Sequence, residues 1–203
     1  MNVTQLFGIP LYSKQLQVNN DLLHSYEDWN PINNGQRTKT NKYLNDNPYY
    51  SDLMAQCVNE YMYEVLLIKK HIGWRWTTSW GLRHDPGHFS KVHIHANAMF
   101  SCILYTEVPE ESGDLIISKD QRPTWTTGTV LPDVERLTNL TAPEVHIKAS
   151  NGYCIIFPGF VHHGSGVNKS NDSRYCIVGN VFVKGTMGDD DDHHGSPLSE
   201  LVI

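Results

Sequence analysis

The sequence predicts a mainly β protein, an antiparallel sandwich or barrel that carries N-terminal helices on its outside. Seven short, apolar, strand-like runs follow residue 74, separated by Gly, Pro, Asn and Asp. Before residue 70, one long segment instead has apolar side chains at helical spacing. The chain has 203 residues, of which 39% are hydrophobic and 19% charged. It is therefore long enough to bury a core without metal or disulfide staples.

Two helices are expected near the start of the chain. Asn20 can cap a short helix over residues 21–29, and Ser51 can cap a longer one that runs to about residue 70. The apolar face of the longer helix consists of Leu53, Cys57, Val58, Tyr61, Met62, Val65 and Leu66. Residues 31–48 are polar and rich in turn residues, so we expect a loop there.

The predicted strands cover residues 74–83, 91–95, 98–108, 114–119, 144–149, 152–157 and 174–183. On the first strand, Trp74, Trp76 and Trp80 are expected to share one face, as core or pocket wall. Residues 120–143 are too long for an idle connection, so we expect a mobile flap in which Trp125 contacts substrate. The alternative is a packing layer on the barrel, formed by Val130, Leu131, Val134, Leu137 and Leu140.

Composition and charge exclude several classes of protein. The net charge is −6 and no basic stripe exists, which disfavours nucleic-acid binding. Apolar runs such as residues 65–68 are far too short to span a membrane, and the N-terminus has no secretory pattern. Four cysteines without CxxC spacing favour buried free thiols in a reducing compartment, and hence a cytoplasmic protein. We expect one domain over residues 1–184, with its β core at about 74–184, and a flexible acidic tail at 185–203.

The histidines carry the chemical signal. His93 and His95 lie two residues apart on a predicted strand, so both side chains leave the same face and can meet one metal ion. A third ligand can come from His162 or His163, which follow the predicted strand at 152–157. Such a set with open positions suits iron(II) in oxygen chemistry. The alternative is that these histidines are exposed or core residues without a ligand role.

Arg174 begins an otherwise apolar strand. A guanidinium inside a barrel needs an anionic partner, because burying it unpaired is very costly. That partner is either an Asp or Glu at the barrel rim or the carboxylate of a small acid, which Arg can hold through two parallel hydrogen bonds.

The order of these motifs resembles the iron(II)/2-oxoglutarate-dependent oxygenases, and among them a group found in phages and bacteria. The motifs are HIHANAMFSCILYTEVPEESGDLIIS, then GYCIIFPGFVHHGSGVN, then RYCIVGN, within residues 74–184. The resemblance implies a double-stranded β-helix (jelly-roll) core. It also implies iron(II) bound by His93, His95 and His163, with His162 outside the ligand set. Arg174 and Tyr105 correspond to the residues that hold the distal carboxylate of 2-oxoglutarate.

Two departures from the wider family concern the ligands. The position of His95 usually holds Asp or Glu, so the site is either a three-His site or a two-His site completed by water or another side chain. The usual Arg-x-Ser/Thr is Arg174-Tyr175-Cys176 here, which removes one hydroxyl contact to the cosubstrate. Gly87 followed by His93-x-His95 resembles part of the first cupin motif. The glutamate that cupins have four or five residues after the second histidine is absent, because those positions are Met99 and Phe100.

The expected function is therefore that of an iron(II)/2-oxoglutarate-dependent oxygenase, a hydroxylase that uses O₂ and a small-molecule or peptidyl substrate. Trp125 and Asn97 are the candidate substrate contacts. The competing interpretation is a cupin-like metal-binding jelly roll without oxygenase activity. We expect no nucleic-acid or membrane partner, and a location in the cytoplasm of a bacterial or phage-infected cell. The sequence leaves the substrate and the oligomeric state open.

Overall fold

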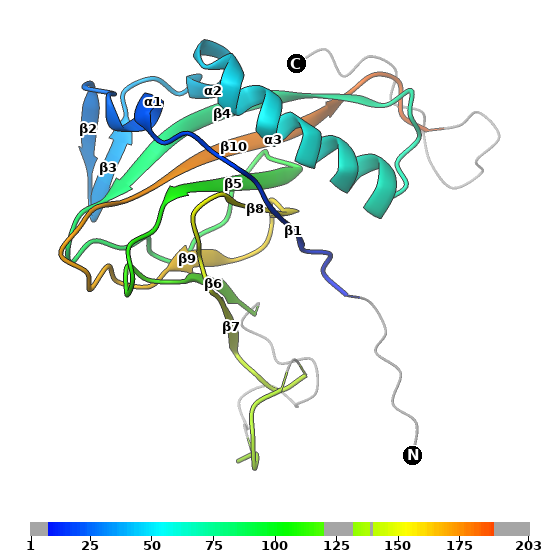
Figure 1. Cartoon of the computed structure of the whole chain (residues 1–203). Coiled ribbons are helices and arrows are strands. Elements are labelled where there is room, and N and C mark those ends of the chain that lie inside the picture. Colours follow the sequence, from blue (N-terminus) through cyan, green and yellow to red (C-terminus); the bar gives the residue numbers. More distant parts are fainter. Residues whose placement is uncertain (1–7, 120–131, 139, 189–203) are drawn as a thin grey trace.

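The protein folds as two antiparallel sheets packed face to face, with helices on the outside of the larger sheet (Figure 1). The structure is a computed structural model, and it describes residues 8–119, 132–138 and 140–188. The larger sheet has the strand order β1-β8-β5-β10-β4-β3-β2, and the smaller has the order β7-β6-β9. The predicted mainly β fold with external N-terminal helices is confirmed.

The larger sheet consists of β1 (Tyr12–Gln15), β2 (Trp29–Ile32), β3 (Gly35–Thr38), β4 (Gly73–His84), β5 (Phe100–Glu107), β8 (Tyr153–Pro158) and β10 (Arg174–Lys184). The smaller sheet consists of β6 (Leu115–Ser118), β7 (Glu144–Ile147) and β9 (His163–Ser165). The helices are α1 (Asp21–His24), α2 (Tyr43–Asp46), α3 (Pro48–Glu60) and the π-helix η1 (Tyr61–Val65). Strands distant in sequence are neighbours: β10 lies between β5 and β4, as in a jelly roll.

The outer face of the larger sheet is covered by α3 and η1 (Figure 1). Met54, Val58 and Tyr61 are fully buried there against Phe100 and Ile177 of the sheet. The Tyr61 and Phe100 rings meet edge to face at 5.1 Å between centroids. Because this face is apolar and closed, polar chemistry is left to the inner face, which looks towards the smaller sheet.

A β-bulge decides which tryptophan reaches the inner face. The β4–β10 register shifts between Asn180 and Val181, and Thr77 is left opposite no residue. Trp74 and Trp76 therefore pack in the outer core, whereas Trp80 packs in the inner one. The prediction that the three tryptophans share one face is wrong, because the bulge shifts the alternation by one residue.

The N-terminal elements differ from expectation. The first helix ends at His24 instead of reaching residue 29, and the Asn20 side chain makes no cap; Asn19 Oδ1 accepts from the Asp21 N–H at 3.0 Å. The long helix begins at Pro48, where the fixed φ of proline suits a first turn, and its helical turns end at Val65. The expected loop at 31–48 instead contains α2 and most of a β2–β3 hairpin.

Residues 91–95 do not form the expected strand. They run extended beside β9 with a single backbone bridge, in which His93 and His163 exchange both N–H···O bonds at 2.9 Å. The prediction of a strand is wrong here. His93 and His163 are close together because of this bridge.

The segment at 120–143 is described only in part, and Trp125, Val130 and Leu131 lie outside the described residues. Within the described part, Val134, Leu137 and Leu140 are 39%, 63% and 48% exposed, which contradicts a packing layer at those three positions. The acidic residues 189–192 of the predicted tail also lie outside the described residues. All four cysteines are buried free thiols, as predicted. Among the described helices, none is long and apolar enough to cross a membrane.

Candidate functional site

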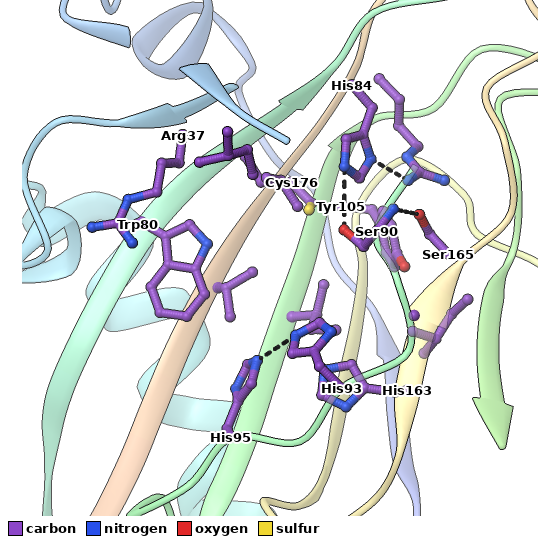
Figure 2. Close-up of a pocket in the computed structure, with 17 residues that line it drawn as sticks. Arg37, Trp80, His84, Ser90, His93, His95, Tyr105, His163, Ser165 and Cys176 are labelled. Atoms are coloured by element: carbon purple, nitrogen blue, oxygen red, sulfur yellow. Dashed lines mark hydrogen bonds between the residues drawn. The ribbon is translucent and has the colours of Figure 1, made fainter. Parts of the chain in front are cut away.

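A cavity of about 220 Å³ opens between the two sheets, and its polar groups gather at two ends (Figure 2). One end holds His93, His95 and His163, and the other holds Arg174 with His84. Apolar side chains from both sheets line the space between, among them Trp80, Leu82, Ile103, Leu115 and Val178. The cavity can therefore accept a small molecule with different chemistry at each end.

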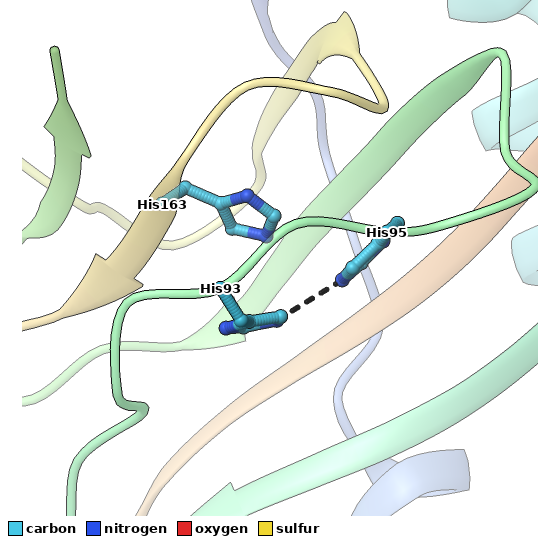
Figure 3. A group of neighbouring side chains, drawn as sticks. All are labelled: His93, His95 and His163. Carbon is cyan, nitrogen blue, oxygen red and sulfur yellow. Dashed lines mark hydrogen bonds between the residues drawn. The ribbon is translucent and has the colours of Figure 1, made fainter. Parts of the chain in front are cut away.

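The three imidazoles converge on one point (Figure 3). His93 and His95 come from the extended segment before β5, and His163 is the first residue of β9. One ring nitrogen from each lies within 4.8 Å of the others, and the His93 and His95 Nε2 atoms are 3.2 Å apart. His162 is not part of this cluster. No Asp or Glu belongs to it either, among the residues that the structure describes.

Hydrogen bonds to oxygen fix the tautomer of each ring. The Nδ1–H groups of His93 and His163 donate to the carbonyl oxygens of Lys91 at 2.7 Å and Val161 at 2.8 Å. The His95 Nδ1–H donates to Asn180 Oδ1 at 2.6 Å. With each proton held at Nδ1, the lone pair of each ring is at Nε2, which is how metal-binding histidines are oriented.

Asn180 is itself held in place. Its Nδ2 donates to Thr78 Oγ1 at 2.9 Å, which leaves Oδ1 as the acceptor that faces His95. Thr78 and Asn180 are register partners across β4 and β10, just before the bulge. Sequence reasoning missed Asn180, because its role depends on this register.

Burial keeps the imidazoles of His95 and His163 neutral. It lowers the pKa of His163 to about 3 and that of His95 to about 4. At neutral pH both rings therefore offer a free lone pair. Three imidazole nitrogen ligands suit a borderline divalent ion such as iron(II) and add no negative charge to it.

At the other end, Arg174 is 2% exposed and lacks an acidic partner among the described residues. Its Nη1 donates to the carbonyl oxygens of Ser112 at 2.9 Å and Gly113 at 2.5 Å. Its Nη2 donates to His84 Nδ1 at 2.5 Å. These contacts use three of the five guanidinium N–H groups, so Nε–H and one Nη2–H remain for another acceptor.

His84 supports Arg174 and was missed as a site residue. It faces Arg174 in the β4–β10 register and is 1% exposed. Burial, aided by the positive charge of Arg174, lowers its pKa to about 3, so the ring is neutral. Nδ1 can then accept from Arg174 while Nε2–H donates to Ser90 Oγ at 3.2 Å. The period-2 alternation of β4, which places residues 80, 82 and 84 on the cavity face, could have identified His84 from the sequence.

Tyr105 lies on β5 and lines the same cavity. The side chain is 2% exposed, and burial raises the pKa of its phenol, so the group stays protonated. Its hydroxyl group has no hydrogen-bond partner in the described part of the chain. A protonated phenol without a partner is available to donate into the cavity.

Two further groups lie beside the histidines. The Arg37 guanidinium lies over the Trp80 ring at 5.9 Å, and Trp80 lies beside His95 at 5.6 Å between centroids. Asn97, two residues after His95, is exposed and has a φ of 62°. It lines a second, larger groove of about 850 Å³, which also includes Asn180. Trp125 lies outside the described residues.

Comparison with known proteins identifies a family. A family model described as "Putative 2OG-Fe(II) oxygenase" matches residues 78–180, just over half of the chain. A search of curated proteins found no match.

Solved structures share the fold at low sequence identity. HygX from Streptomyces hygroscopicus, solved with nickel, 2-oxoglutarate and hygromycin B, matches with a TM-score of 0.58 and 9% identity, over 85% of this chain and 82% of that one. The epimerase SnoN from nogalamycin biosynthesis, solved with Fe³⁺, α-ketoglutarate and nogalamycin RO, gives 0.58 and 12%, over 89% and 81%. A 2OG-Fe(II) oxygenase family oxidoreductase from Burkholderia pseudomallei gives 0.56 and 11%, over 79% and 74%. The matches show that the jelly-roll fold of these oxygenases is shared.

Proposed function

Because this chain belongs to the 2OG-Fe(II) oxygenase family, we propose that it binds iron(II) and 2-oxoglutarate and hydroxylates a small-molecule or peptidyl substrate. The observation that carries this proposal is the cavity itself. It presents three imidazole lone pairs at one end and a buried, partly unsatisfied guanidinium at the other.

The residues present fit a divalent metal ion. His93, His95 and His163 would hold it through their Nε2 atoms, because each Nδ1 is already bonded to an oxygen. The alternative that these histidines have no ligand role is disfavoured, since His95 and His163 are buried and buried polar atoms without partners are rare.

The residues present also fit a short dicarboxylate. Arg174 would hold the distal carboxylate through its two unused N–H groups, and the Tyr105 hydroxyl would donate to the same group. The neutral His84 ring accepts from Arg174 and so fixes the plane of the guanidinium without competing for the anion. Trp80, Leu82 and Ile103 exclude water from the space between the ends.

When bound, iron(II) and 2-oxoglutarate would supply the O₂-dependent oxidation of the substrate, coupled to conversion of 2-oxoglutarate to succinate and CO₂. The chain itself positions the two ends of the cosubstrate and leaves the His95 side of the centre for the substrate, with Asn97 as a proposed contact. The four buried free thiols are consistent with a reducing cytoplasm, which we propose as its location, in a bacterial or phage-infected cell.

The test is succinate formation from 2-oxoglutarate by the purified protein with iron(II), ascorbate and air. Slow formation without substrate supports the proposal, and the His163→Ala variant should lose it. Tight metal binding with no succinate under any of these conditions would favour the cupin-like, non-enzymatic alternative.

A further inference from the structure

The groove beside His95 is lined by positive charge without any acid. Its described lining includes Arg75 and Lys42, together with Asn45, Asn97 and Asn180, and contains no Asp or Glu. The whole chain carries a net charge of −6, so this local excess of cations runs against the overall charge. A cleft lined by one sign of charge concentrates ions of the opposite sign.

Both cations are free to bind a ligand. Neither Arg75 nor Lys42 has a side-chain hydrogen bond, ion pair or ring contact within the described residues. Arg37, which lines the cavity at the histidines, differs because its guanidinium lies over the Trp80 ring. Trp76 and Phe182 also line the groove, although both side chains pack against the outer core.

The groove adjoins the histidines through Asn180, which lines it and accepts the hydrogen bond of His95 Nδ1. The cavity on the Arg174 side has its own lining and fits the cosubstrate. A molecule in the groove would therefore lie on the other side of His95.

We infer that the groove binds an anionic group of the substrate, a carboxylate or a phosphate, between Arg75 and Lys42. This inference rests on the proposed function, because it makes the groove the substrate side of that centre.

The first experiment measures binding by calorimetry to the full-length protein without metal. The probes are phenyl phosphate, 3-phenylpropionate and the neutral 3-phenylpropanamide. We expect each anion to bind about tenfold more tightly than the amide, because charge-assisted hydrogen bonds are stronger than neutral ones. Tighter binding of phenyl phosphate than of 3-phenylpropionate would indicate a phosphate group on the substrate, and the reverse order would indicate a carboxylate.

Variants locate the binding. Arg75→Gln should remove most of the preference for anions, and Arg75→Lys should keep part of it, which separates loss of charge from loss of fold. Lys70→Gln is the charge-matched control, because Lys70 pairs with Glu64 and does not line the groove. Equal affinity for anion and amide overturns the inference. So does an anion preference that survives in the Arg75→Gln, Lys42→Gln double variant but is lost in Arg174→Ala.

The second experiment measures relaxation of the bound probes by manganese(II) loaded at the histidines. Enhanced relaxation of the probe nuclei supports a substrate site beside the metal. Normal relaxation with manganese bound overturns the substrate assignment and leaves a separate anion site. If manganese does not bind at all, the proposed function fails instead, while the metal-free binding result stands on its own.

Discussion

The two ends of the central cavity present opposite hydrogen-bonding groups, lone pairs at the histidine end and N–H donors at the Arg174 end. At one end three imidazoles have their Nδ1–H groups bonded to oxygen atoms and present lone pairs at Nε2. At the other end Arg174 presents only N–H donors, and neutral His84 occupies one of them. The first end attracts a cation and the second an anion, so the hydrogen bonds behind each group determine what it can bind.

The largest expected effect is at the histidine end. His93→Ala and His163→Ala should each weaken metal binding by more than about a hundredfold, since even second-layer changes at metal sites cost ten- to a hundredfold. Titration of iron(II) or nickel(II) with calorimetric detection measures this.

The matched control is His162→Ala, which removes an adjacent imidazole outside the cluster and should keep most of the affinity. Retained metal binding in His163→Ala would disprove the ligand assignment.

Substitutions at the Arg174 end should change the binding of 2-oxoglutarate instead of the binding of metal. Arg174→Ala should weaken 2-oxoglutarate binding to the metal-loaded protein by roughly tenfold to more than a hundredfold, while metal affinity stays the same. Arg174→Lys keeps the charge but not the paired donors, so its affinity for 2-oxoglutarate should lie between those of the wild type and the alanine variant. Unchanged 2-oxoglutarate affinity in the alanine variant would move the anchor elsewhere.

A smaller effect is expected from the support of His95. Asn180→Ala removes the shorter of the two hydrogen bonds of His95 Nδ1, leaving Ser101 Oγ at 3.0 Å, and should lower metal affinity by up to about tenfold. Asn180→Asp retains an acceptor at the same place and should preserve binding. Equal affinity in wild type and the alanine variant would mean that the tautomer of His95 is fixed without Asn180.

The smallest expected effect is the contribution of His84 to the pH dependence of folding stability. The folded-state pKa of His84 is about 3, below its ordinary value of 6.5, so the unfolded state binds more protons between these values. Stability is therefore lost as pH falls below about 6.5. His84 should contribute roughly 1.4 kcal/mol of that loss between pH 7.5 and 5.5.

Urea unfolding of the metal-free protein at the two pH values measures this loss. His84→Gln should lose less stability than the wild type over the interval. An equal loss in both proteins would show that His84 is not held neutral in the fold.

The sequence predicted the apolar strands of the core because their composition and turn residues are local signals. It missed the β2–β3 hairpin because the short flanking strands are largely polar, and the two turn residues, Asn33 and Asn34, are not the Asn-Gly or Asp-Gly pair that signals a tight hairpin. The bulge at Thr77 and the extended course of residues 91–95 depend on pairing with distant strands. Local periodicity does not encode such pairing.

The candidate site divides in the same way. His93, His95, His163, Arg174 and Tyr105 were identified from motifs and resemblance, and all five line one cavity. His84 and Asn180 were missed because each acts through a register partner or a hydrogen bond across the fold. The ligand role of the triad and the cosubstrate role of Arg174 and Tyr105 stay predictions.

A crystal structure with iron(II) and 2-oxoglutarate introduced without oxygen tests the central claim most directly. The account predicts anomalous density for one metal ion about 2.1 Å from the Nε2 atoms of His93, His95 and His163, taking zinc–imidazole distances as a guide. It also predicts the distal carboxylate of 2-oxoglutarate on Arg174 and Tyr105. A metal ion held by only two of the histidines, or a carboxylate bound away from Arg174, would contradict it.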